Sequence, residues 1–238
     1  MKQPLGVLVV HGFTGYRATV EGILPHLDQA ELPHRMPCLR GHWTRPEDLI
    51  GVTARDWFDD VNKGLDDLLT EVDQAIVVGL SLGGILSLWL SMERARDLAG
   101  VVGVAPCLRF ADPLAGLTPF IAPLIKFWPM PKAPKDVGYT AQNYPYFPTK
   151  TFGEFYELNR RIEQDLARVT SPLLLMHSQH DKTASPLSSQ IIYDRVGSQD
   201  KELVWFDRSG HEMMMDRDRE RVFELIMAFV RKRAGAIA

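Results

Sequence analysis

A serine placed between glycines gives this chain its clearest chemical signal. Gly79-Leu80-Ser81-Leu82-Gly83 has the spacing G-x-S-x-G and directly follows the apolar run Ala75-Ile76-Val77-Val78. A serine at this spacing can occupy a tight turn between a strand and a helix, where side chains at the flanking positions would collide with backbone. Residues 82–92 are apolar almost all round, which predicts a buried helix after the turn. Ser81 is therefore a candidate nucleophile.

A serine hydroxyl is a weak nucleophile, so it needs a base within hydrogen-bond reach and a third group that orients the base. Asp181 and His211 follow the apolar runs 172–176 and 202–206, which we expect to be strands of the same sheet as residues 75–78. Polar residues after parallel strands gather at one edge of a sheet, where ligands bind. Asp112, which follows the expected strand 101–104, is a second candidate for the orienting acid.

Five motifs together resemble those of the α/β-hydrolase superfamily, and more narrowly of its small carboxylesterases and monoacylglycerol lipases. They are His11-Gly12-Phe13-Thr14-Gly15, Leu39-Arg40-Gly41-His42, Gly79-Leu80-Ser81-Leu82-Gly83-Gly84, His180-Asp181 and Ser209-Gly210-His211. The bare G-x-S-x-G pattern is frequent, but the whole ordered set is specific. The resemblance covers the chain outside residues 107–169.

This resemblance implies a role for each matching residue. Ser81 would be the nucleophile, His211 the general base and then the general acid, and Asp181 the carboxylate that orients His211. The backbone N–H groups of Phe13 and Leu82 would form the oxyanion hole. His11 and His42 would be structural loop histidines in this family. The chain departs from the pattern at Trp43, where these relatives often have glycine.

Strand and helix patterns alternate along most of the 238 residues, which predicts one α/β domain with a mostly parallel sheet of about six strands and helices on both faces. Eight prolines between residues 107 and 169 interrupt the alternation. We expect residues 1–106 and 170–238 to form an α/β-hydrolase core and residues 107–169 a small, mainly helical cap insertion. Thr53, with Asp56 three residues on, predicts a helix N-terminus, and residues 36–39 a short strand.

The expected cap is unusually apolar for a surface element. Four of its large side chains are candidates for an acyl-chain slot: Phe120, Leu124, Phe127 and Trp128. The simpler interpretation is that these side chains pack the cap onto the core. The expected reaction is hydrolysis of carboxylic esters with short to medium acyl chains, including monoacylglycerols, through an acyl-Ser81 intermediate.

Composition and charge exclude several other classes. A net charge of -3 without a basic block argues against nucleic acid as a partner. Prolines interrupt the apolar stretch 114–130, so no stable membrane insertion is expected. Cys38 and Cys107 lack disulfide or metal spacing, which predicts a cytoplasmic protein. His177, His180 and Asp181 lack another ligand at a recognised spacing, so neither a metal nor a cofactor is expected. The sequence gives no indication of the oligomeric state.

Other chemistry is compatible with the same three side chains. A hydrolase of carbon–carbon bonds, a thioesterase and a cofactor-free peroxidase can all use this arrangement, because fold and triad do not select the substrate. A dehalogenase is disfavoured, since those relatives carry aspartate at the position of Ser81. A non-catalytic module that binds a small ligand is the alternative from another class, although such a module has no chemical need for all three residues.

Overall fold

The structure, a computed structural model, describes residues 2–130, 139–140 and 142–237. Its centre is a six-stranded parallel sheet with the strand order β2-β1-β3-β4-β7-β8. The strands are β1 Gln3–Val10, β2 His34–Arg35, β3 Val72–Leu80, β4 Leu98–Val104, β7 Leu173–Ser178 and β8 Lys201–Phe206. The expected fold class, with about six mostly parallel strands, is confirmed.

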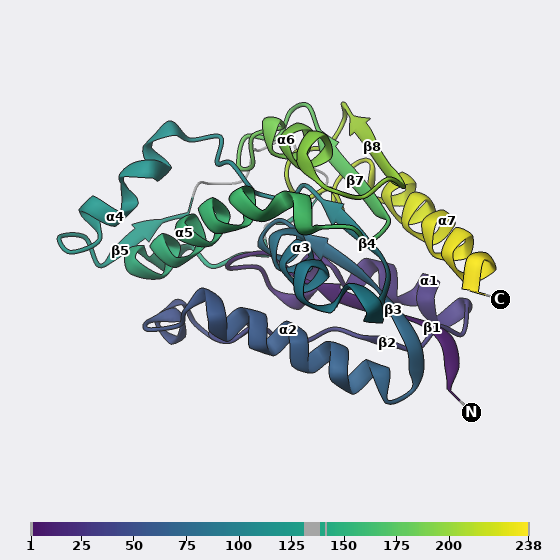
Figure 1. The fold of residues 1–238 in the computed structure, drawn as a ribbon. Coiled ribbons are helices and arrows are strands. Elements are labelled where there is room, and N and C mark those ends of the chain that lie inside the picture. Colours follow the sequence, from purple (N-terminus) through teal and green to yellow (C-terminus); the bar gives the residue numbers. More distant parts are fainter. Residues whose placement is uncertain (1, 131–138, 141, 238) are drawn as a thin grey trace.

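Helices cover both faces of this sheet (Figure 1). The longer helices are α1 Leu24–Gln29, α2 Ala54–Leu69, α3 Leu82–Arg94, α5 Thr149–Asp165, α6 Leu187–Arg195 and α7 Arg219–Ile237. Single 3-10 turns occupy Arg17–Thr19, Glu21–Ile23, Pro46–Leu49, Ala95–Asp97, Pro113–Leu117 and Leu166–Arg168.

Two separate hydrophobic clusters fill the space between the sheet and its helices. Alternate residues of β1 divide between them: Leu8 and Val10 pack with Trp57 of α2, whereas Val7 and Val9 pack in the cluster that contains Ile226 of α7. Because successive side chains of a strand point to opposite faces, a strand covered on both sides must be apolar throughout. This explains the continuous apolar runs in the sequence.

The capping pattern at Thr53 forms as expected. The Thr53 side chain accepts a hydrogen bond from the backbone N–H of Asp56, and the Asp56 side chain accepts one from the N–H of Thr53, so α2 begins with a capping box. The strand expected over residues 36–39 is wrong: β2 is His34–Arg35, which pairs with Val7 and Leu8 of β1. Pro37 lacks the N–H needed to continue this pairing, and Leu39 is buried in the loop that follows.

The chain between β4 and β7, which we call the β4–β7 segment, holds α4 Thr118–Ile121, α5 and a two-stranded antiparallel sheet of β5 Phe127–Pro129 and β6 Tyr146–Pro148. The sequence did not predict this small sheet. Figure 1 shows α4, β5 and part of α5 beyond the end of the large sheet, on the side away from both chain termini. Since the strands are parallel and begin near the N-terminus, this is the side of their carboxyl ends.

Candidate active site

Ser81 occupies the turn between β3 and α3. Its backbone has φ 55° and ψ -114°, a left-handed conformation that is uncommon and strained for a residue with a side chain. The N–H of Ser81 donates to the carbonyl of Val104 in β4 at 3.0 Å, which anchors the turn to the neighbouring strand. The helix α3 starts at the next residue, so the positive end of its dipole lies at Ser81.

The glycines of the motif allow three backbones to meet at this turn. A Cβ atom on Gly79 would lie 2.2 Å from the carbonyl oxygen of Gly83, and one on Gly83 would lie 2.3 Å from the carbonyl oxygen of Val10. Both distances are far below van der Waals contact. The glycine spacing is therefore a requirement of packing between β1, β3 and α3, as the sequence suggested.

Asp181 and His211 form a direct hydrogen bond. The Nδ1–H of His211 donates to Oδ2 of Asp181 at 2.7 Å, while Oδ1 accepts from the backbone N–H groups of Thr183 and Ala184 at 2.8 and 2.9 Å. Asp181 is buried, and its carboxylate is thus held at both oxygens. Asp112, the other candidate acid, is exposed and accepts from the N–H of Leu114 instead.

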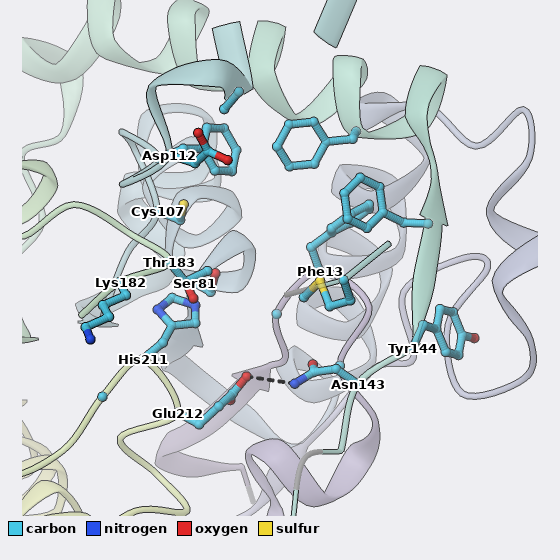
Figure 2. Close-up of a pocket in the computed structure, with 18 of the residues that line it drawn as sticks. Phe13, Ser81, Cys107, Asp112, Asn143, Tyr144, Lys182, Thr183, His211 and Glu212 are labelled. Carbon is cyan, nitrogen blue, oxygen red and sulfur yellow. Dashed lines mark hydrogen bonds between the residues drawn. The ribbon is translucent and has the colours of Figure 1, made fainter. Parts of the chain in front are cut away.

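Ser81 lies next to His211. Figure 2 shows the Ser81 hydroxyl beside the His211 ring, with Asp112 further along the cavity wall. With Nδ1 committed to Asp181, Nε2 is the nitrogen of His211 that can act on a serine proton. The structure thus brings Ser81, His211 and Asp181 together from the ends of β3, β8 and β7.

Charge and burial act in opposite directions on this pair. Burial alone would raise the pKa of the Asp181 carboxyl, but His211 and His177 outweigh it and hold that pKa below its usual value. Burial disfavours protonation of His211, yet the charge and hydrogen bond of Asp181 raise its pKa above the ordinary value. Asp181 therefore stabilises the imidazolium that would form when His211 takes a proton.

The loops that carry Asp181 and His211 are tied to each other. The Ser178 hydroxyl at the end of β7 donates to the carbonyl of Ser209, and it accepts from the N–H of His180. Ser209 in turn bonds Asp218 through its hydroxyl at 2.9 Å. These buried bonds fix the relative positions of the two loops, and with them the contact between the carboxylate and the imidazole.

The loop after β1 runs directly past Ser81. A Cβ atom on Gly12 would lie 3.2 Å from Cβ of Ser81. Two residues further on, the backbone N–H of Thr14 donates to Nε2 of His42 at 3.0 Å, which holds the loop in place. Phe13 lies between these anchors and lines the cavity at Ser81, while Leu82 is the first residue of α3, where a backbone N–H has no acceptor within the helix.

A cavity of about 1530 Å³ opens above Ser81 between the core and the β4–β7 segment. One part of its wall is polar and includes Asn143, His211 and Glu212, with Asn143 donating to Glu212 at 3.0 Å. Figure 2 shows Asn143 and Glu212 on one side of His211 and Asp112 on the other. The remaining wall is mostly apolar: Phe13, Phe110, Leu114, Leu117, Ile121, Ile125, Trp128, Met130, Phe147, Phe152 and Phe155.

The structure corrects most of the expected acyl-slot residues. Trp128 lines the cavity, but Phe120, Leu124 and Phe127 do not. Phe120 and Leu124 are 76% and 86% exposed. The cavity instead receives Ile121 and Ile125, which are one turn apart on the other face of the same stretch. Because both faces of this stretch are apolar, its pattern did not indicate which face is turned inward.

Several cavity residues escaped the sequence analysis. Phe110, Phe155, Asn143 and Glu212 lie far apart in the sequence and belong to no motif. Leu114, Thr118, Ile121 and Ile125 line the cavity at a helical spacing, but Phe120 and Leu124 have a helical spacing too, so spacing alone did not single out the inner face. His177, which the sequence suggested only as an improbable metal ligand, instead contacts Asp181. Among the described residues, no group of histidine, cysteine and acidic side chains is arranged to hold a metal ion.

Comparison with known families agrees with the geometry. A family model described as serine aminopeptidase, S33, matches residues 3–218. The chain belongs to this hydrolase family. The S33 match includes the three strand ends that carry Ser81, Asp181 and His211, and it also includes the whole β4–β7 segment.

Curated relatives of this S33 protein act on esters according to their names. It is 29% identical to a thermostable monoacylglycerol lipase of Bacillus sp. (strain H-257), over 98% of this chain and 92% of the relative. It is 27% identical to a carboxylesterase of Bacillus subtilis (strain 168), over 95% and 92%. Both alignments run through the core and the β4–β7 segment alike.

Solved structures share the fold. A structure from a study of LipS and LipT, two metagenome-derived lipolytic enzymes, superposes with a TM-score of 0.91 at 29% identity and covers 98% of this chain and 95% of that one. A monoglyceride lipase variant from Saccharomyces cerevisiae superposes with a TM-score of 0.80 at 18% identity, over 98% and 87%, which is a likeness of fold alone. In the described part of the S33 chain, no helix is long and apolar enough to cross a membrane.

Proposed function

We propose that this protein is a serine hydrolase that cleaves carboxylic esters through a covalent acyl-Ser81 intermediate. The observation that carries the proposal is the hydrogen bond between Asp181 and His211, placed beside Ser81 at the base of a large, mostly apolar cavity. Ester-cleaving names among the relatives support the same class of reaction.

In the first half of the reaction, His211 Nε2 takes the proton of the Ser81 hydroxyl as its oxygen attacks the ester carbonyl carbon. The carbonyl oxygen becomes an oxyanion, which the N–H groups of Phe13 and Leu82 stabilise. The bond to the alcohol oxygen then breaks, and His211 gives its proton to the departing alcohol. In the second half, water loses a proton to His211 and attacks the carbonyl carbon of the acyl-Ser81 ester. The bond to the Ser81 oxygen then breaks, and His211 returns the proton to that oxygen, which releases the acid and restores the serine.

The cavity supports a division of the substrate into two parts. The apolar wall formed by Ile121, Ile125 and Trp128 suits an acyl chain of short to medium length, because burying each methylene group contributes about 0.8 kcal/mol. The polar wall around Asn143 and Glu212 suits the alcohol part. We include monoacylglycerols among the candidate substrates, with the β4–β7 segment acting as a cap over Ser81. A cytoplasmic location belongs to the same proposal, and Cys38 and Cys107 are both free thiols.

Two measurements test this function. Wild-type protein is expected to react with a fluorophosphonate probe and to hydrolyse p-nitrophenyl esters. Its kcat/KM should be highest for an acyl chain longer than acetate and shorter than palmitate. Ser81→Ala should abolish labelling and lower kcat by about 10⁴-fold or more. Ser185→Ala, a serine outside the cavity lining, is the matched control and should keep both.

The outcomes separate this proposal from its alternatives. If the folded wild-type protein is not labelled, it is a non-catalytic binding module. Labelling together with turnover of amino-acid p-nitroanilides but not of esters would assign it to the peptidase chemistry after which the family is described. Equal rates across all acyl lengths would contradict an acyl chain held by the apolar wall.

A further inference from the structure

A second histidine, His177, faces the carboxylate of Asp181. It lies at the end of β7, four residues before Asp181, and its side chain is fully buried. Its Nε2 is 3.2 Å from Oδ2 of Asp181, the same oxygen to which His211 donates, and 3.3 Å from the carbonyl oxygen of Ala184. Two imidazoles therefore meet one carboxylate oxygen, and the reaction proposed above uses only one of them.

The surroundings of His177 decide which of its nitrogens carries a proton. Both groups within reach of Nε2, the Asp181 carboxylate and the Ala184 carbonyl, can only accept a hydrogen bond, so Nε2 must be protonated. The other nitrogen, Nδ1, is 2.7 Å from the hydroxyl of Ser189 in α6, a group that can donate. In a neutral ring, Nδ1 accepts from Ser189, while the Nε2–H is shared between the Ala184 carbonyl at 3.3 Å and Oδ2 of Asp181 at 3.2 Å.

We propose that His177 is a positioning residue for Ser81 chemistry: its Nε2–H fixes Oδ2 of Asp181 and shares the negative charge that this oxygen presents to His211. The inference rests on the triad proposed above. It extends the series of contacting polar side chains from His211 and Asp181 to His177 and Ser189, so that a buried side chain of α6 helps to orient the base.

This arrangement has a consequence for the basicity of His211. The negative charge on Oδ2 of Asp181 favours the protonated, imidazolium form of His211. This effect is strongest when His211 is the only donor to that oxygen. A second donor on the same oxygen reduces that effect and at the same time keeps Asp181 ionised in a buried place. His177 thus holds the pKa of His211 below the value that an unshared carboxylate would give it.

The other ionisable groups near Asp181 and His211 come from several elements. Cys107 follows β4, Tyr139 precedes β6, His180 and Lys182 belong to the Asp181 loop, and Glu212 and Asp216 follow β8. Substitution of His177 leaves all of them in place. A change in the pH dependence that follows such a substitution therefore reports the contact between His177 and Asp181.

The first test uses the wild-type protein and needs no turnover. Nitrogen-15 NMR of histidine-labelled protein distinguishes the protonated nitrogens of each ring, and comparison with His177→Gln assigns the signals. We expect His177 to be protonated at Nε2. A ring protonated at Nδ1 alone overturns the proposal, whatever the protein hydrolyses.

The second test compares pH profiles of kcat/KM. His177→Leu removes the donor, so the acid limb should move to higher pH by about one unit. Its kcat should fall about 10- to 100-fold, because the base is less well oriented. His177→Gln keeps an N–H donor and should restore the wild-type acid limb.

The possible outcomes of the NMR test and of the pH profiles can be told apart. If folded His177→Leu has the wild-type acid limb and kcat, His177 only packs the core and the proposal is wrong. If His177→Leu does not fold, the NMR result and the His177→Gln profile still decide. Loss of the proposed function would look different, since wild-type protein would then show no ester turnover at all.

Discussion

Two further histidines hold the loop that carries Phe13. His11 Nε2 accepts from the N–H of Leu39 at 3.1 Å, and His42 Nε2 accepts from the N–H of Thr14. A nitrogen that accepts a hydrogen bond carries no proton, so both rings are neutral. Burial lowers the pKa of His11 to about 4 and that of His42 well below its usual value, and the nearby His11 ring adds to the effect on His42.

These lowered pKa values predict a loss of stability in mild acid. A histidine that is neutral when folded takes up a proton more readily when unfolded, so its contribution is complete above pH 6.5 and lost as the pH falls to 4. His11 alone should reduce the free energy of unfolding by about 3 kcal/mol between these limits. Urea unfolding at a series of pH values measures this change.

The matched variant for this measurement is His11→Gln, which has no titrating group. Its free energy of unfolding should depend less steeply on pH between 6.5 and 4 than that of the wild type, even if it is lower at every pH. Parallel curves for the two proteins would show that His11 takes up a proton as readily in the folded state as in the unfolded one, which would contradict a buried ring that accepts from Leu39.

Among the individual site residues, the sequence predicted those that belong to a motif and missed those that belong to none. Ser81, Asp181 and His211 could be nominated because each follows a strand and matches a family motif. The contact of His177 with Asp181 depends on how the chain turns after β7, and the pairing of Asn143 with Glu212 joins distant segments. Neither follows from spacing along the chain.

Among the elements, the turn from β3 to α3 tolerates the least change. Ala in place of Gly79 would put a methyl group 2.2 Å from the Gly83 carbonyl, so β3 and α3 must separate. We expect Gly79→Ala to lower the free energy of unfolding by about 3 kcal/mol or more and to reduce ester turnover with it. Urea unfolding and a p-nitrophenyl ester assay on the same preparations measure both effects.

Gly153 provides the control for this substitution. It lies within α5, and a Cβ atom there would meet no neighbouring atom within 4 Å. Gly153→Ala should therefore raise the free energy of unfolding by up to about 1 kcal/mol, since alanine favours the helix. If Gly79→Ala were as harmless as Gly153→Ala, the close approach of β3 and α3 would not be needed for the turn.

The strands of the buried core could be predicted because helices cover both faces of the sheet, so the side chains on both faces of each strand must be apolar. The runs that became β1, β3, β4 and β7 have no polar interruption at their centres, and the capping box fixed the start of α2. The short edge strand β2 is different. It is only half buried, so its apolar neighbours did not mark its limits.

In the whole molecule, the cavity depends on how the β4–β7 segment lies over the carboxyl ends of the strands. The resemblance to the α/β-hydrolases implied that this segment would form a cap over Ser81, because of its place between two strands of that fold. The sequence could not predict which side of α4 and the following turn faces inward, because Ile121 and Phe120 are both large and apolar. Only the way in which α4 lies against α5 distinguishes the two faces.

The inward face therefore predicts where acyl-chain length is controlled. Ile121→Trp adds volume to the cavity wall, so it should lower kcat/KM for p-nitrophenyl decanoate about tenfold relative to the butyrate. Phe120→Ser changes the neighbouring side chain, which is 76% exposed and outside the cavity lining, and should leave that ratio unchanged. An equal loss for both esters in Ile121→Trp would mean that the acyl chain follows another part of the wall. A changed ratio in Phe120→Ser would mean that the outer face of α4 also contacts the substrate.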